Sequence, residues 1–254
     1  MFETFPAKDA DGVSKDERVA LEEPLQITLD GRPIAVVMRS PGNDGDLVMG
    51  FLITEGIIPD LQVIRKLDLE SRPNHALVFL REDFVVDVSR LQRNFFSASS
   101  CGVCGKATIE GVMSDHPPLA HVKNFHAEAV LGAPDKLRKA QAAFEATGGI
   151  HAAGLYNESG NLLIVREDVG RHNAVDKVVG AALQGGLDTS ECFLLVSGRV
   201  SFEIMQKALV AAIPLVAAIS APSSLAVQFA NQSGQMLVAF LRPPRYNVYA
   251  GRLS

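Results

Sequence analysis

The feature that most constrains the fold is an alternation of short apolar runs with amphipathic stretches in the second half of the chain. Each apolar run is short enough for a strand, and the stretch after it keeps helical spacing, as Val175, Val178 and Ala182 do. The expected strand–helix pairs are Leu162–Arg166 with Asn173–Leu183, Cys192–Ser197 with Ser201–Ala212, and Leu215–Ser220 with Pro222–Gln232. A helix over Pro134–Ala146 precedes them, and a last strand over Met236–Leu241 follows. This alternation predicts a sheet covered by helices, much of it parallel.

Residues 21–90 predict a smaller α+β unit. Two β-rich runs flank Asp30-Gly31, a dipeptide typical of tight hairpin turns. An amphipathic helix follows them and ends at a glycine. The expected elements are strands over Leu25–Leu29 and Pro33–Arg39, a helix over Asp44–Gly56, and strands over Ala76–Leu80 and Phe84–Val88. Residues 1–20 carry few apolar groups and are predicted to be a disordered tail.

Residues 91–125 separate the two units and show no periodicity. They contain prolines, histidines and a pair of cysteines, so this segment is expected to be an exposed and mobile loop. Residues 126–254 form the second domain. The predicted fold class is therefore α/β, with an α+β N-terminal unit and a domain whose helices lie on a mixed, largely parallel sheet.

The composition is that of an ordinary globular protein, with 47% hydrophobic and 21% charged residues. The formal net charge is −5 and no Lys/Arg-rich run occurs, so neither nucleic acid nor a membrane is an expected partner. The N-terminus is polar and acidic, unlike a secretory signal. The longest apolar run, Ala208–Ile219, is interrupted by Pro214 and is too short to span a bilayer. Three cysteines make no disulfide framework, which favours the reducing cytoplasm.

Cys101 and Cys104 are the strongest chemical signal in the chain. They lie among Ser, Ala and Gly residues that offer little to bury them. Gly102 and Gly105 allow backbone conformations that present each sulfur on a bare loop, and the charge of Lys106 favours an ionised sulfur. Because the thiolate is the reactive form of cysteine, the sequence predicts a pair of reactive cysteines here.

Two other roles for a C-x-x-C pair are less well supported. A structural zinc site needs two further ligands at suitable spacing. Cys192 begins an expected buried strand and is interpreted as a core residue, which leaves His116, His121 and His126 on the proline-containing segment as candidate ligands. A thioredoxin-like oxidoreductase needs a strand immediately before the pair, and none is predicted. No tightly held metal is therefore expected.

Glycine-rich and polar segments follow several of the predicted strands. Ligands of open α/β sheets bind beyond the carboxyl ends of the strands, where helix N-termini offer free N–H groups. The segments are Asp168–His172, Ser197–Arg199 and Ser220–Ser224. Arg171 and Arg199 can engage phosphate oxygens, and His172 and Ser197 lie beside them. The pattern predicts a phosphate-bearing ligand at this place and a functional role for His172.

The stretch from Gly148 to Ala153 is similar to the beginning of a zinc deaminase site, in which His-x-Glu is followed later by Pro-Cys-x-x-Cys. Ala153 stands where the glutamate is needed, and no such cysteine motif follows. Deaminase chemistry is therefore excluded, although the fold can be shared. His151 is interpreted as a structural histidine or one that faces a ligand.

Two arginines near the C-terminus flank a pair of prolines. The prolines would hold Arg242 and Arg245 stiffly. One interpretation is a solvated basic tail after the last strand. The other is a pair of guanidinium groups held for an anionic ligand.

Together these motifs resemble the FdhD family, the accessory proteins of formate dehydrogenase maturation. The matching stretches occur in order and cover most of residues 25–250. They are SSCGVCGKA at 99–107, TGGIHAAGL at 147–155, REDVGRHNAVDKVVG at 166–180, VSGRVSFEIMQKA at 196–208, PLVAAISAPSSLAV at 214–227 and FLRPPRYNVY at 240–249.

The resemblance implies a sulfur carrier, and hence a sulfurtransferase. Such a protein accepts sulfur as a persulfide from a cysteine desulfurase of the IscS type. It passes the sulfur to the molybdenum (or tungsten) bis(molybdopterin guanine dinucleotide) cofactor before insertion into formate dehydrogenase. Cys101 takes the persulfide position, and Cys104 is expected to be an assisting thiol.

The resemblance also implies where the cofactor is bound. The family's contact falls on the hexapeptide Phe240, Leu241, Arg242, Pro243, Pro244 and Arg245. Guanine nucleotides such as GDP are then expected to bind as mimics. A cytidine-deaminase-like fold for residues 126–254 and a homodimer are further implications. The alternative function is a cofactor-binding chaperone without sulfur transfer.

Overall fold

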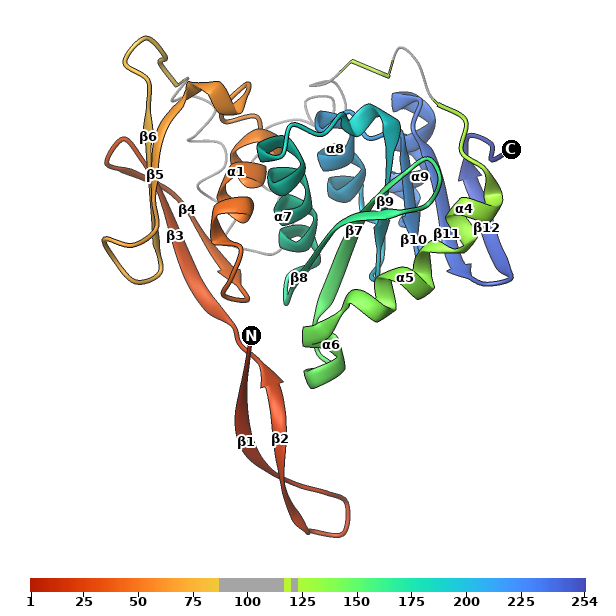
Figure 1. Ribbon diagram of the computed structural model, residues 1–254, viewed down its shortest axis with the longest axis horizontal. Helices are drawn as coiled ribbons and strands as arrows, with labels where there is room; N and C mark the ends of the chain where they lie inside the picture. The colour runs from red at the N-terminus through yellow and green to blue at the C-terminus, as the bar shows by residue number, and fades with distance from the viewer. Residues whose placement is uncertain (87–116, 120–122) are drawn as a thin grey trace.

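A mixed six-stranded sheet forms the centre of the larger part of the computed structural model, in the strand order β12-β11-β10-β9-β7-β8 (Figure 1). The structure describes residues 1–86, 117–119 and 123–254. The strands are β7 (His151–Asn157), β8 (Leu162–Asp168), β9 (Cys192–Val196), β10 (Leu215–Ala218), β11 (Met236–Arg242) and β12 (Arg245–Ala250). β8, β9, β10 and β11 point in the same direction, and β7 and β12 are antiparallel to their neighbours. The predicted α/β class with a mixed sheet is confirmed. The sheet is less parallel than expected, because only the β9–β10 and β10–β11 pairings are parallel and the other three are antiparallel.

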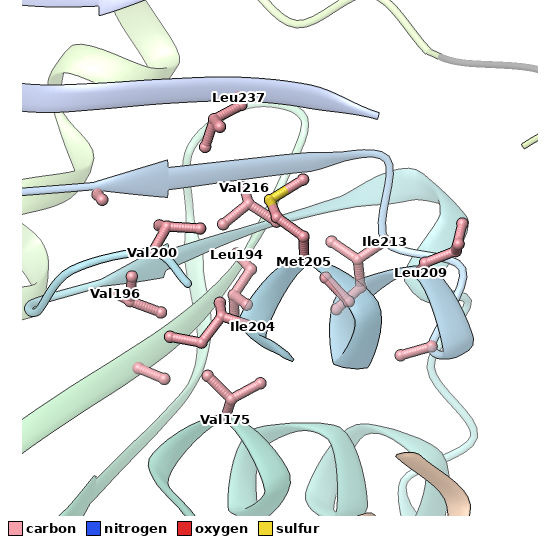
Figure 2. Packing of buried hydrophobic residues seen from close by; sticks show 14 of the residues in the cluster. Val175, Leu194, Val196, Val200, Ile204, Met205, Leu209, Ile213, Val216 and Leu237 are labelled. Carbon is pink, nitrogen blue, oxygen red and sulfur yellow. The ribbon is translucent and has the colours of Figure 1, made fainter. Parts of the chain in front are cut away.

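Helices cover both faces of this sheet. One face carries α7 (Arg171–Gln184), α8 (Phe202–Val210) and α9 (Ser224–Ser233), and the other carries α4 (Ala127–Leu131) and α5 (Ala133–Ala140), which α6 (Ala142–Thr147) follows. Because neighbouring strand residues face opposite sides, Leu194 packs toward α7 and α8 while Phe193 packs toward Leu137 of α5. Figure 2 shows Val175 and Ile204 directed at Leu194. Burial on both faces explains why these strands are unbroken apolar runs.

The N-terminal unit has its own four-stranded sheet, in the order β4-β3-β6-β5. Its elements are β3 (Glu23–Leu29), β4 (Arg32–Arg39), α1 (Asp44–Thr54), β5 (Ile64–Asp68) and β6 (His75–Leu80). Short 3₁₀ turns occur at Leu61–Val63 and, in the larger domain, at Thr189–Glu191. Asp30 and Gly31 have φ angles of 45° and 81°, as a two-residue hairpin turn requires, so the predicted hairpin is confirmed.

The two parts join where α1 lies alongside α7 (Figure 1). A Cβ atom on Gly50 of α1 would overlap with the carbonyl oxygen of Asp176, and one on Gly180 of α7 would overlap with that of Asp46. The glycines therefore allow the two helix backbones to touch.

A buried cation supports the same joint. Nζ of Lys207 on α8 lies 2.6 Å from Oε1 of Glu55 and 3.0 Å from Oδ1 of Asp176. Thr54 accepts a hydrogen bond from the same ammonium at 3.0 Å. Burial alone would lower the pKa of Lys207, but the carboxylates of Asp176 and Glu55 raise it, so the group stays charged.

The expectation of a disordered tail over residues 1–20 is wrong. These residues form an antiparallel hairpin of β1 (Phe2–Lys8) and β2 (Ser14–Ala20) that extends away from the rest of the molecule (Figure 1). The turn is held by Asp9, whose carboxylate accepts the backbone N–H groups of Asp11 and Val13. The low number of apolar residues did not indicate this hairpin, because it is held by backbone hydrogen bonds and by a turn residue and not by a hydrophobic core.

Other boundaries also differ from the sequence expectations. Residues 84–86, the described part of the expected strand Phe84–Val88, are not a strand, and β6 pairs instead with β5. The expected helix Pro134–Ala146 is divided at Gln141 into α5 and α6. β7 and β12 were not predicted. No helix in the described part of the chain is long and apolar enough to cross a membrane.

Candidate functional site

The carboxyl ends of β8, β9, β10 and β11 lie at one edge of the six-stranded sheet because these strands run in the same direction. β7 runs the opposite way and begins at this edge with His151. The neighbouring ends are connected, since Ser197 Oγ accepts the backbone N–H of Ala152 at 2.9 Å. The N–H of Phe240 donates to the carbonyl oxygen of Ser220 at 3.0 Å. The structure thus brings together the segments that the sequence predicted, and adds His151 to them.

His151 lies against the backbone of the loop after β9. A Cβ atom on Gly198 would lie only 3.2 Å from His151 Nδ1 and 3.8 Å from Cδ of Arg171, so the bare glycine makes room for both side chains. Burial lowers the pKa of His151, and the positive charges of Arg171 and Arg199 lower it further. His151 is therefore a neutral imidazole beside two permanent cations near neutral pH.

Arg171 is the first residue of α7, where the backbone N–H groups lack intrahelical acceptors. Its Nε is buried and has no hydrogen-bond partner among the residues that the structure describes. An unpaired buried donor costs roughly 1–3 kcal/mol, so the arrangement retains a donor at the expense of stability. Arg199 is exposed in the loop after β9. A guanidinium group at a helix N-terminus and a second one on the loop after β9 suit the oxygens of a phosphate or pyrophosphate.

His172 connects the first turns of α7 and α8. Its Nε2 lies 2.8 Å from Oε2 of Glu203 and 3.0 Å from Oγ of Ser201. The His172 and Glu203 side chains are 17% and 11% exposed. Sequence analysis missed Glu203, although a glutamate between Phe202 and Ile204, in a stretch predicted to be a buried helix, was an available signal.

A buried ion pair fixes the loop that begins α7. Oδ2 of Asp168 lies 2.7 Å from Nζ of Lys177, and Oδ1 accepts the N–H of Gly170 at 2.8 Å and the amide of Asn173 at 2.9 Å. Ser40 of the N-terminal unit donates its N–H to Oδ2 at 3.1 Å and accepts from Lys177 at 2.9 Å. Residues from both parts of the molecule therefore hold this loop in place, a contact that sequence analysis did not foresee.

The hexapeptide Phe240–Arg245 connects β11 to β12, so it is a hairpin and not a basic tail. Arg242 and Arg245 are exposed and pair across the hairpin. Leu241 is buried, whereas Phe240 is 39% exposed and has a φ of 50°. A bulky residue in the left-handed region is strained, and such strain persists mainly at functional sites. Pro243 and Pro244 occupy the turn.

The remaining predicted residues fall into two groups. Cys101 and Cys104 lie outside the described residues, as do His116 and His121. Cys192 is buried in β9, and burial raises the pKa of its thiol, which agrees with its interpretation as a core residue. Within the described ranges, no group of three or more His, Cys, Asp or Glu side chains could hold a metal ion.

Comparisons with known proteins agree with this picture. A family model described as the FdhD/NarQ family matches residues 20–253. A protein of Streptomyces avermitilis named sulfur carrier protein FdhD is 45% identical, over 94% of this chain and 89% of the relative. The protein of the same name from Mycobacterium tuberculosis is 44% identical, over 93% of this chain and 91% of the relative.

A solved structure extends the likeness to the fold. It is a crystal structure of a protein from Desulfotalea psychrophila that is described as a formate dehydrogenase accessory protein. It superimposes with a TM-score of 0.78 at 27% sequence identity, and the match covers 99% of this chain and 96% of that one.

Proposed function

The chain belongs to the FdhD/NarQ family, and from this premise we propose that it is a sulfur carrier that serves the maturation of formate dehydrogenase. In this proposal a cysteine desulfurase of the IscS type supplies the sulfur as a persulfide. The recipient is the molybdenum (or tungsten) bis(molybdopterin guanine dinucleotide) cofactor, which is cargo and not a resident group. We place the exchange in the cytoplasm and expect a homodimer.

The loading step transfers one sulfur atom without net oxidation. The Cys101 thiolate attacks the outer sulfur of the desulfurase persulfide, the donor's S–S bond breaks, and the donor cysteine leaves as a thiolate. Cys101 then carries the persulfide. Cys104 can resolve it, because its thiolate can attack the inner sulfur and release hydrosulfide. The two electrons come from the cysteine pair, which is left as a disulfide that a cellular thiol reduces.

The observation that carries the cofactor part of the proposal is the buried Nε of Arg171 at the start of α7, which has no hydrogen-bond partner among the described residues. Arg171 and Arg199 both lie close enough to His151 for their charges to lower its pKa. These groups form a cationic edge that suits a pyrophosphate. Ser197 and His172 lie at the same edge. The cofactor carries pyrophosphates, so we assign this edge to its nucleotide part.

The hairpin Phe240–Arg245, with its strained Phe240 backbone, supports a second contact with the cofactor. Phe240 is hydrogen-bonded to Ser220 at the edge, and Arg242 and Arg245 follow it on the hairpin. An exposed aromatic ring can stack on a base, and guanidinium groups can engage phosphate oxygens. GDP would therefore bind as a partial mimic.

Complementation tests the function. In a strain that lacks the native protein, Cys101→Ala should abolish formate dehydrogenase activity while GDP binding remains. Cys104→Ala should be impaired as well. Cys192→Ala is the control, because Cys192 is buried away from this edge and should support maturation. Full activity with Cys101→Ala would favour the alternative, a cofactor-binding chaperone without sulfur transfer.

A further inference from the structure

The hairpin of β1 and β2 exposes a concentration of apolar side chains. It is a sheet of only two strands and extends away from the rest of the molecule (Figure 1). An isolated two-stranded hairpin is at best marginally stable in water, so such a ribbon needs something packed against it. Among the described residues, thirteen large hydrophobic side chains are exposed, and five of them lie in this hairpin: Met1, Phe2, Phe5, Val13 and Val19. Apolar side chains gathered on an unsupported ribbon indicate a surface that a partner covers.

The apolar side chains are distributed over two faces of the hairpin. Side chains that stand opposite each other on paired strands lie on the same face, and the register therefore defines the two sets. One face carries Phe2, whose ring is covered by the guanidinium group of Arg18 at 4.8 Å from the ring centroid. The other face, which we call the Phe5 face, consists of Met1, Glu3, Phe5, Ala7, Lys15, Glu17, Val19 and Leu21.

The Phe5 face has an apolar stripe that nothing in the described part of the chain covers. Phe5, Val19 and Met1 are 48%, 46% and 43% exposed, and none of them belongs to a hydrophobic cluster of the described residues. The backbone N–H of Leu21 donates to the carbonyl oxygen of Met1 at 3.0 Å, so the paired ribbon continues to the end of this stripe. A flat, partly apolar sheet face of this kind packs against another sheet about 10 Å away.

The charges on the Phe5 face are complementary to those of a second copy. Lys15 lies toward the turn of the hairpin, Glu3 lies toward its base, and Glu17 stands between them, paired with Lys15. If two copies pack face to face in opposite directions, the turn of each hairpin lies over the base of the other. Lys15 of each copy then approaches the two glutamates of the second copy. A two-fold axis makes this contact twice, as a dimer with equivalent surfaces requires.

We propose that the Phe5 face is the interface between two copies of this chain, with the two hairpins packed face to face and antiparallel about a two-fold axis. The inference rests on the homodimer expected under the proposed function and names the surface that forms it. Phe5, Val19 and Met1 of both copies form a small apolar core between the ribbons. Two hairpins that are marginal alone thereby become one four-stranded, two-layered unit.

The oligomeric state of the full-length protein, followed by analytical ultracentrifugation over a range of concentrations, tests the interface. The wild type should be a dimer that dissociates on dilution. Phe5→Asp should raise the dissociation constant at least about a hundredfold, because the dimer loses two buried rings and gains two charges in their place. Thr4→Asp is the matched control. It adds the same charge to the same strand on the opposite, exposed face, so it should dimerise like the wild type.

Exchange of the charges on the Phe5 face distinguishes a contact between copies from damage to the hairpin. Lys15→Glu leaves three negative charges on this face, and the double variant Glu3→Lys/Glu17→Lys leaves three positive ones. Each variant should be monomeric at concentrations where the wild type is dimeric, because like charges would face each other. An equimolar mixture of the two should form a heterodimer. A mixture that stays monomeric would overturn the antiparallel contact, since unfolded hairpins would give the same result with or without mixing.

Three other outcomes would also overturn the proposal. A wild type that is monomeric at every concentration would exclude the dimer. A dimer that Phe5→Asp leaves intact, or that Thr4→Asp dissociates equally, would assign the interface to another surface. A monomeric wild type that binds a cysteine desulfurase, with binding lost in Phe5→Asp, would assign the Phe5 face to that enzyme instead. Sulfur loading of Cys101 is measured separately, so each of these results leaves the sulfur-carrier proposal standing.

Discussion

Asp168 and Lys177 form an ion pair, with 2.7 Å between Oδ2 and Nζ, in which neither side chain has any exposed surface. The pair holds the loop that begins α7 at the candidate site, and two of its other hydrogen bonds reach Ser40 in the N-terminal unit. Its geometry connects the site to the joint between the two parts of the molecule.

Lys177→Met should lower the free energy of unfolding by roughly 3–5 kcal/mol, because it leaves the Asp168 carboxylate buried and unpaired. Denaturant unfolding measures this loss. The double variant Asp168→Asn/Lys177→Met should recover part of it, since no uncompensated charge remains. A loss below about 1 kcal/mol in Lys177→Met would show that the carboxylate finds another partner.

The close contact between α1 and α7 can be tested by comparing the stability of alanine variants at two glycines of α1. Gly50→Ala should destabilise the protein by about 1–3 kcal/mol, because the new methyl group would overlap with the carbonyl oxygen of Asp176. Gly45→Ala, also in α1, would place its methyl group 3.7 Å from Leu69 and 3.8 Å from Leu67, which are ordinary contact distances, and should be neutral or stabilising by up to about 1 kcal/mol. Thermal unfolding of the two variants side by side checks the difference. Equal stability would contradict the close contact.

The sequence predicted the elements that follow from local rules. The Asp30-Gly31 dipeptide predicted a hairpin turn, and the alternation of apolar runs with amphipathic stretches predicted the strand–helix pairs of the larger domain. β12 was missed because the segment from Arg242 to Arg245 was interpreted either as a solvated basic tail or as a pair of guanidinium groups for an anion, and not as the start of a further strand. The hairpin of β1 and β2 was missed because few of its residues are buried.

The candidate site could be predicted only in part. Arg171, His172, Ser197 and Arg199 follow strand ends, and parallel strands place such ends at one edge. The Ser40–Asp168 and His172–Glu203 contacts join residues far apart in the sequence. No local pattern specifies such pairs, because they depend on how α1, α7 and α8 pack together.

The stability of the protein should depend on pH through His151. Its pKa is lowered in the folded state, so the unfolded chain binds more protons as the pH falls through the ordinary histidine value of about 6.5. Folding stability should therefore decrease between about pH 7 and about pH 5. His151→Gln should lose less stability over this range than the wild type, as measured by unfolding at each pH. An unchanged pH dependence in His151→Gln would contradict burial as the cause.

Arg245→Ala should weaken GDP binding about ten- to hundredfold, because a charge-assisted hydrogen bond contributes roughly 1.5–3 kcal/mol. Titration calorimetry at two salt concentrations checks this, and the wild-type affinity should fall at the higher one. Arg65→Ala, on the exposed strand β5 of the N-terminal unit, is the control and should bind GDP normally. Unchanged affinity in Arg245→Ala would mean that the hairpin does not hold the nucleotide.

Intact-protein mass spectrometry tests the sulfur-carrier proposal most directly. After incubation with a cysteine desulfurase and cysteine, the wild-type chain should gain the mass of one sulfur atom, and a thiol reductant should remove it. Cys101→Ala should gain nothing, whereas Arg245→Ala should load normally, because the nucleotide contact takes no part in loading. An unmodified wild-type chain, or the same gain in Cys101→Ala, would contradict the assignment of the persulfide to Cys101.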